Sequence, residues 1–150
     1  MGSMFDAQDR APMVARAHTL TPQAGRRWGS MTAPQMVWHL SAQLRHLLGE
    51  LEVQPRGAPI LRTAFVHWLI IDSPLPFPRG GAQTSPELVA FEPGEWDADV
   101  AQLVTRLERW AGRGMAAGAC VHPAFGPLDG RQAGKLVWKH WNHHLTQFGV

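Results

Sequence analysis

Apolar residues recur at helical spacing in several stretches of the chain. Residues 33–51 and 95–113 each place them on one side of a helix at about 100° per residue. The same pattern predicts a shorter helix over residues 9–18, with Asp9 as its N-cap, and a last helix after Asp129 that ends at Gly149. Residues 60–71 are apolar nearly all round, which favours a third helix, with a strand as the alternative.

Turn-forming residues separate these stretches. Thr32 and Gln35 have the spacing of a capping box, which predicts a helix start at residue 33. Residues 73–93 contain five prolines and the adjacent Gly80 and Gly81, so we expect a long Pro-rich connection with one short turn at residues 86–89. Residues 118–128 are expected to form a loop, made rigid by its prolines and plugged by Phe125.

These elements predict an all-α fold. Four substantial amphipathic helices, an additional short helix and no persuasive alternating strand indicate a four-helix bundle, with the Pro-rich connection as a crossover. A length of 150 residues fits one domain with one core. We assign residues 5–150 to that domain and interpret residues 1–4 as a remnant of an expression tag or a disordered start.

Composition and charge narrow the classes of partner. The net charge is only +2 and the arginines are scattered, so no nucleic-acid partner is expected. The longest apolar stretch, residues 64–71, falls short of the ~20 residues of a membrane helix, so no membrane partner is expected. The single Cys120 and the lack of a signal-peptide layout favour a reducing cytoplasm. A small-molecule ligand and a homodimer stay open.

Histidines near the C-terminus carry the strongest chemical signal. His140 and His144 are four residues apart on the apolar side of the predicted last helix, so both can present a nitrogen to one ion. The same spacing also fits two core histidines that are hydrogen-bonded to backbone or water. A third ligand should come from another helix: His39, at the edge of the apolar stripe of residues 33–51, is placed best and His46 second.

Other histidines and the tryptophans give weaker signals. His143 lies off the centre of the apolar side and is expected beside the ligands or at the surface, with replacement of a ligand as the alternative. His18, His67 and His122 have no partner at ligand spacing. The tryptophans are expected to fill the core, although Trp141 could instead form a pocket wall near the three histidines.

Three motifs occur together in this sequence. They are Met31-Thr32-Ala33-Pro34-Gln35-Met36 followed by His39, then His122-Pro123 with Phe125-Gly126, and finally Lys139-His140 with His143-His144 and Gln147-Phe148-Gly149. In this combination, and over nearly all of residues 5–150, the chain resembles the DinB/YfiT-like metal-binding four-helix-bundle superfamily, in a branch known as a bacterial domain of unknown function. The resemblance implies that His39, His140 and His144 bind a divalent ion, zinc or nickel before others.

The resemblance also implies a class of reaction. Some relatives conjugate bacillithiol to an electrophile or isomerise maleylpyruvate with mycothiol, which implies a thiol-dependent S-transferase acting on small electrophiles, with a low-molecular-weight thiol as second cofactor. Three neutral imidazoles leave an ion its +2 charge and an open coordination position, where hydroxide or thiolate forms near neutral pH. Arg45, Arg62 and Lys139 are candidate anchors for an acidic thiol.

Two further interpretations stay open at this point. No His-Glu-x-x-His motif or other general base accompanies the histidines, so a hydrolytic metalloprotease is not expected. The chain could instead be a non-catalytic, metal-stabilised bundle that serves as an interaction or stress-response protein, with the ion tying the second helix to the last. A bundle with satisfied core histidines and no metal is the third interpretation.

Overall fold

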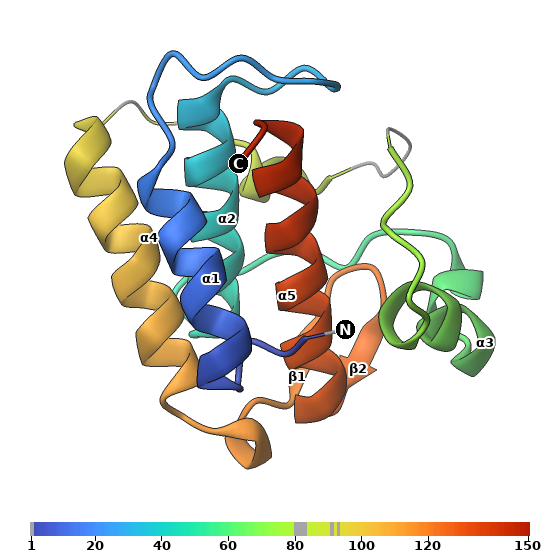
Figure 1. Cartoon of the computed structure of the whole chain (residues 1–150). Helices are drawn as coiled ribbons and strands as arrows, with labels where there is room; N and C mark the ends of the chain where they lie inside the picture. Colours follow the sequence, from blue (N-terminus) through green and yellow to red (C-terminus); the bar gives the residue numbers. More distant parts are fainter. Residues whose placement is uncertain (1, 80–83, 91, 93) are drawn as a thin grey trace.

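The computed structural model describes residues 2–79, 84–90, 92 and 94–150, and it is mainly helical (Figure 1). Gly80, Gly81 and Pro93 of the expected connection lie outside these residues. The helices and strands are α1 (Ala7–His18), α2 (Ala33–Leu47), α3 (Ala64–His67), α4 (Trp96–Ala111), β1 (Cys120–His122), β2 (Gly126–Leu128) and α5 (Gly130–Gln147). Short 3₁₀ turns occur at Pro59–Arg62, Pro86–Leu88 and Met115–Ala117, and a π-helical turn follows α3 at Trp68–Asp72. No helix in the described part of the chain is long and apolar enough to cross a membrane.

Side-chain caps set the starts of the two helices that carry the site. The Thr32 hydroxyl accepts from the Gln35 amide at 3.4 Å, and the Gln35 side chain accepts from the Thr32 amide at 2.9 Å, so the predicted capping box of α2 is confirmed. Asp129 and Gln132 form the same arrangement at the start of α5. Gly49, with φ +79°, ends α2 earlier than residue 51, because that backbone conformation favours glycine and stops the helix.

The start of the chain differs from the expectation. Asp6, and not Asp9, caps α1, because the Asp9 carboxylate instead accepts from the Ser3 amide at 2.8 Å. Met4 is 0% exposed, and its amide donates to the carbonyl of Gly134 at 3.1 Å. The expected disordered start is therefore wrong for residues 2–4, which are held against α5.

The predicted third helix is also wrong as one continuous element. Residues 60–71 divide into the 3₁₀ turn Pro59–Arg62, the single α-helical turn α3 and the π-helical turn Trp68–Asp72. The division occurs at Thr63, whose backbone is extended at φ −83° and ψ 148° and whose hydroxyl accepts from the Val66 amide to start α3. The strand alternative is wrong as well.

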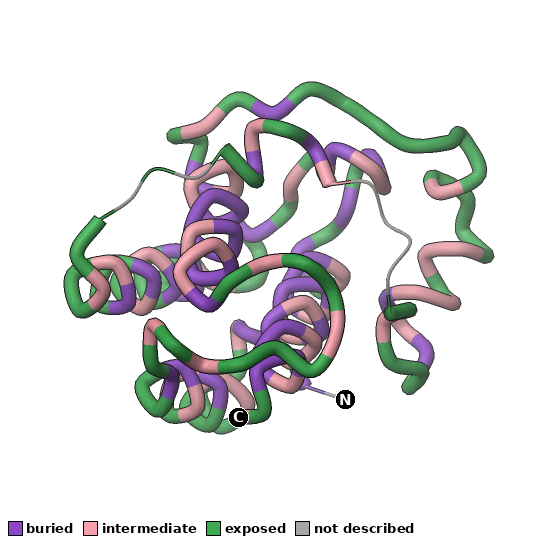
Figure 2. Tube along the Cα trace, turned by 90° about the horizontal axis from the view of Figure 1, so that it is seen from above, coloured by how far each residue is buried: buried purple, intermediate pink, exposed green. Residues whose placement is uncertain are grey.

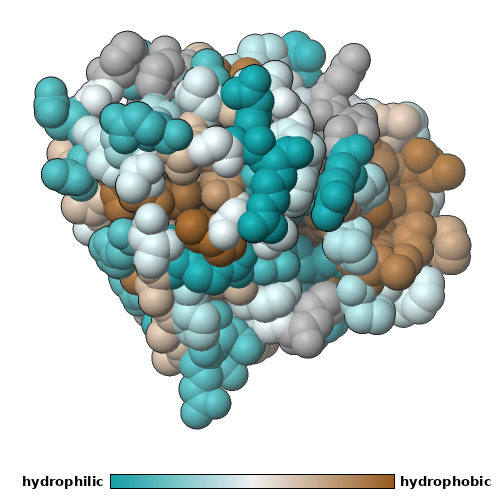
Figure 3. All heavy atoms as spheres, turned by 45° about the horizontal axis from the view of Figure 1, so that its top comes forward, coloured by the Kyte–Doolittle hydropathy of each residue, from teal (hydrophilic) through white to brown (hydrophobic). Residues whose placement is uncertain are grey.

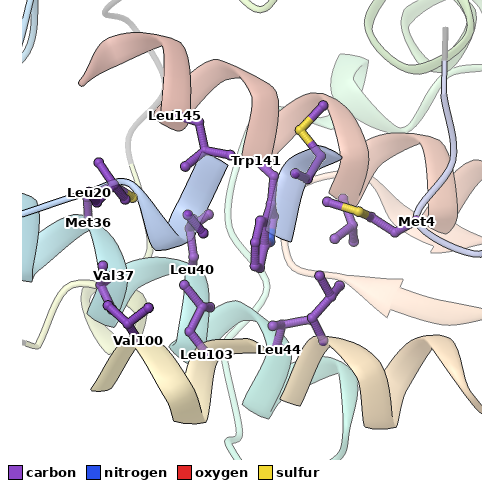
Figure 4. Close-up of a cluster of buried hydrophobic side chains, with 14 of the residues drawn as sticks. Met4, Leu20, Met36, Val37, Leu40, Leu44, Val100, Leu103, Trp141 and Leu145 are labelled. Atoms are coloured by element: carbon purple, nitrogen blue, oxygen red, sulfur yellow. The ribbon is translucent and has the colours of Figure 1, made fainter. Parts of the chain in front are cut away.

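The four longer helices bury their apolar sides against one another. α2 packs on α4, and α1 packs on α5. In Figure 2 the buried residues lie on the sides by which these helices face each other. Trp141 is fully buried and reaches from α5 into the middle of the cluster, beside leucines of α2 and α4 (Figure 4). Trp141 is therefore a core residue, and the alternative of a pocket wall is wrong.

Residues 118–128 contain a β-hairpin where a loop was expected, so the fold is not purely α. Cys120 pairs with Leu128 and His122 with Gly126. The His122 ring closes the turn, because its Nδ1 accepts from the amides of Ala124 and Phe125, each at 3.2 Å. Phe125 packs on a small separate cluster of buried residues, Ile71, Leu128 and Leu136.

Candidate metal centre

Three histidine side chains from two helices meet between α2 and α5. The Nε2 atom of His140 lies 3.0 Å from Nε2 of His39 and 3.0 Å from Nε2 of His144. Each of the three rings offers a nitrogen within 4.8 Å of the others. His39 and His144 are 4% and 8% exposed, and His140 is half-buried. The structure thus brings the three histidines selected from the sequence close enough to bind one metal ion; we call this set the triad.

The outer nitrogen of every triad ring faces an oxygen atom. Nδ1 of His39 lies 3.0 Å from the Leu88 carbonyl, Nδ1 of His140 lies 2.8 Å from Gln43 Oε1, and Nδ1 of His144 lies 2.8 Å from Gln147 Oε1. An amide or carbonyl oxygen only accepts, so in this arrangement each Nδ1 carries the ring proton. Each Nε2 is then unprotonated, and its lone pair points toward the other two rings.

Contacts around the triad fix two of these proton positions, those of His39 and His144. The Gln147 amide cannot turn over freely, because its Nε2 donates to the Trp28 carbonyl at 2.7 Å. The partner of His39 is a backbone carbonyl, which can only accept a hydrogen bond. Partners of this kind hold a metal-binding imidazole in one tautomer and orientation.

The spacing of the inner nitrogens fits a metal ion. Metal–imidazole bonds of about 2.0–2.1 Å, with angles between roughly 90° and 110°, place neighbouring nitrogens about 2.8–3.4 Å apart. Both Nε2–Nε2 distances on His140 are 3.0 Å, within that range. A set of three neutral imidazoles suits zinc, nickel, copper and iron.

Burial keeps the triad in the form that binds metal. Desolvation lowers the pKa of His39, against a smaller opposing effect of its hydrogen bond with Leu88. Desolvation lowers the pKa of His144 to about 3, with the positive form of His39 as the next cause. The pKa of His140 is lowered well below its ordinary value, first by burial and then by His144 and His39. All three rings are therefore neutral at neutral pH, and no proton competes with the ion.

The other histidines lie outside the triad. The ring nitrogens of His46 face the carbonyls of Leu51 and Val121 at 3.1 and 3.2 Å, so this second choice for the third ligand was wrong. His143 stacks edge-on to His144 with ring centroids 5.1 Å apart, but it does not belong to the set. His67 donates from Nε2 to the Phe125 carbonyl at 2.9 Å, and His18 is exposed.

A cavity of about 690 Å³ lies along the side of α5 that carries Lys139, Asn142, His143 and Thr146. Phe77 lines this cavity and also lies near the triad, because its ring centroid is 6.4 Å from that of His140. The ring centroid of His143, which lines the cavity as well, is 6.0 Å from that of Phe77. Of the three expected thiol anchors, Lys139 lines this cavity, whereas Arg45 and Arg62 do not.

Sequence reasoning missed the groups that orient the triad. Gln43 and Gln147 are both nearly buried and hold the outer nitrogens of His140 and His144. A signal was present, since Gln43 follows His39 by four residues and Gln147 follows His144 by three, which places each near a ligand on its own helix. The Leu88 carbonyl had no such signal, because it belongs to the short turn Pro86–Leu88.

Comparison of this chain with protein-family models, with curated proteins and with solved structures gives no match. The resemblance to the DinB/YfiT-like superfamily therefore stays a prediction.

Proposed function

We propose that this chain is a divalent-metal protein that holds one ion, zinc or nickel, through Nε2 of His39, His140 and His144. The observation that carries the proposal is the direction of the lone pairs: the three outer nitrogens face acceptors, the inner nitrogen of His140 lies 3.0 Å from those of His39 and His144, and no acidic group belongs to the set. Neutral imidazoles in this arrangement lack a donor between them, and a cation supplies the missing partner.

We propose further that the fold is a DinB/YfiT-like four-helix bundle. Pairing of α2 with α4 and of α1 with α5 supports it, as do ligands supplied by the second helix and the last. The positions of the two capping boxes support it too, because they start the two helices that carry those ligands.

The activity we favour is a thiol-dependent S-transfer to a small electrophile. A bound ion would supply a Lewis acid that lowers the pKa of a thiol at an open coordination position. The residues of this chain would do the rest: Gln43 and Gln147 hold the rings in place, and half-buried His140 forms the accessible side of the triad. Phe77 lines the cavity with its ring centroid 6.4 Å from that of His140, where it would limit the entry of water.

A non-catalytic, metal-stabilised interaction protein is the second candidate, and an exposed apolar surface favours it. Ile60, Phe65 and Trp68 are 63%, 68% and 55% exposed. Figure 3 shows hydrophobic surface gathered on the side of the molecule where α3 lies in Figure 1. Large exposed apolar patches are typical of interaction sites.

Elemental analysis by inductively coupled plasma mass spectrometry tests the metal proposal. We expect close to one ion per chain in tag-free wild-type protein and in the matched control His143→Ala, and almost none in the double variant His39→Ala/His144→Ala. A wild-type protein that takes up no divalent metal even after reconstitution would overturn the proposal.

Titration of the metal-loaded protein with low-molecular-weight thiols separates the two candidates. Cobalt-substituted protein should develop a thiolate-to-metal charge-transfer band with a suitable thiol if the transferase reading is right. Absence of that band with every thiol tested, together with a large fall in melting temperature on chelation, would favour the interaction protein.

A further inference from the structure

The cavity along α5 is lined by none of the triad residues. Its wall from α5 includes Lys139 and His143, and the opposite wall is the segment of residues 74–79 together with Trp28. A volume of about 690 Å³ is in the range of small-molecule sites. The cavity is therefore large enough to bind a small molecule without any contribution from a metal ion at the triad.

The charged side chains that line this cavity, Arg79 and Lys139, are both positive. The Arg79 guanidinium carbon lies 4.2 Å from the ring centroid of Trp28, and the Lys139 ammonium lies 5.4 Å from the ring centroid of Phe77. Lys139 donates to the carbonyls of Ile70 and Ser73, which carry no net charge. The lining includes no carboxylate, and neither cation forms an ion pair within the described part of the chain. The cavity thus favours a negative charge.

Aromatic rings give the cavity its shape and a spare donor. Trp28 meets His143 edge-on at 5.6 Å, and Phe77 lies across from α5. Nε1 of Trp28 is buried and has no hydrogen-bond partner among the described residues, although buried donors are normally paired. By contrast, the side-chain oxygens of Asn142 and Thr146 already accept from Arg16 at 2.7 and 3.1 Å.

We propose that this cavity binds an aromatic carboxylate, with the acid group at the Arg79 guanidinium and the flat body between the rings of Trp28 and Phe77. Arginine matches the planar, two-oxygen geometry of a carboxylate. The apolar rings exclude water from the body of the ligand and so strengthen the charged contact. The site goes beyond the proposed metal function, since none of its lining residues belongs to the triad.

Isothermal titration calorimetry with 1-naphthoate tests this inference, with neutral 1-naphthamide as the matched probe. We expect one naphthoate per chain and at least tenfold weaker binding of the amide. Arg79→Gln should weaken naphthoate at least tenfold, whereas Arg109→Gln, which removes an exposed arginine of α4, should change it less than twofold. Because Arg79 is exposed, we expect an unchanged melting temperature in that variant.

Three results would overturn the inference: no heat of binding with millimolar naphthoate, equal affinity for the acid and the amide, or unchanged affinity in Arg79→Gln. The comparison of acid and amide uses wild-type protein alone, so it does not depend on how the variant folds. Metal content is measured in every sample. Naphthoate binding in a protein that takes up no metal would leave this inference standing and overturn the proposed function. Metal binding in a protein that does not bind naphthoate would overturn this inference and leave the proposed function standing.

Discussion

Replacing Gln147 by leucine should weaken metal binding although it changes none of the three metal-binding histidines. The Gln147 side chain accepts the Nδ1 proton of His144 at 2.8 Å and donates to the Trp28 carbonyl at 2.7 Å. Leucine fills a similar volume but removes both contacts. The His144 ring then loses the acceptor that keeps its proton on the outer nitrogen, and Nε2 no longer points reliably at the ion.

The expected size of the effect follows from these two contacts. Loss of a partner that orients a metal-binding histidine costs about 10–100-fold in metal affinity. At about 1.4 kcal/mol per factor of ten, this corresponds to about 1.4–2.8 kcal/mol. In the metal-free protein the variant leaves the Trp28 carbonyl without its donor, which lowers the free energy of unfolding by about 1–3 kcal/mol.

Competition with a chromophoric chelator measures the metal affinity, and urea unfolding of the metal-free protein measures the stability. Gln147→Glu keeps an acceptor for His144 and loses only the donor to Trp28, so we expect its metal affinity to stay close to that of the wild type. Gln102→Leu on α4 is the matched control, because Gln102 contacts Arg106 and no triad residue. Wild-type metal affinity in Gln147→Leu would refute the reasoning.

Four other predictions concern the triad, the β-hairpin and Lys139. His140→Ala and His144→Ala should each lose metal in elemental analysis, whereas His143→Ala should retain most of it; equal loss in all three would contradict the assignment of the triad. Gln43→Glu, which can only accept from His140, should bind metal more tightly than Gln43→Leu in the chelator competition. Burial, with His46 and His67 as lesser causes, lowers the pKa of His122 from 6.5 to about 4. Between these values the unfolded chain binds more protons than the folded chain, so the free energy of unfolding should fall as the pH is lowered through this window. Urea unfolding of His122→Asn should show a shallower fall, and a slope equal to that of the wild type would contradict the assignment. Lys139→Met should lower the free energy of unfolding by about 1–3 kcal/mol, because the carbonyls of Ile70 and Ser73 lose their donor; wild-type stability would show that water replaces the ammonium.

Local signals in the sequence predicted the parts of the fold that local contacts determine. The capping box at Thr32 and the N-cap at Asp129 each depend on residues three positions apart, so their spacing is visible in the sequence. The triad was accessible for the same reason: two ligands are four residues apart, and the third, His39, borders the apolar stripe of residues 33–51.

Long-range contacts determine the parts that were predicted wrongly. Residues 60–71 leave regular α-helix where Lys139, far along the chain on α5, binds the carbonyls of Ile70 and Ser73. Asp72, at the end of the same turn, is held by Arg131 and Lys135 of α5. The β-hairpin has strands of only three residues, which are too short for a visible alternation. The packing of Met4 on α5 likewise has no counterpart in the residues beside it.

Protons distinguish the triad from an ordinary cluster of core histidines. Without an ion, a donor must be found between the three inner nitrogens, and only one residue can provide it. His39 is fixed by a backbone carbonyl, and His144 is fixed by Gln147, whose amide is held by Trp28. Gln43 has no comparable restraint among the contacts of the described residues, so turning over its amide would let the His140 proton move to Nε2 and face His39 or His144 at 3.0 Å. Metal binding then requires only the reversal of the Gln43 amide, and His140 is the triad residue whose proton moves.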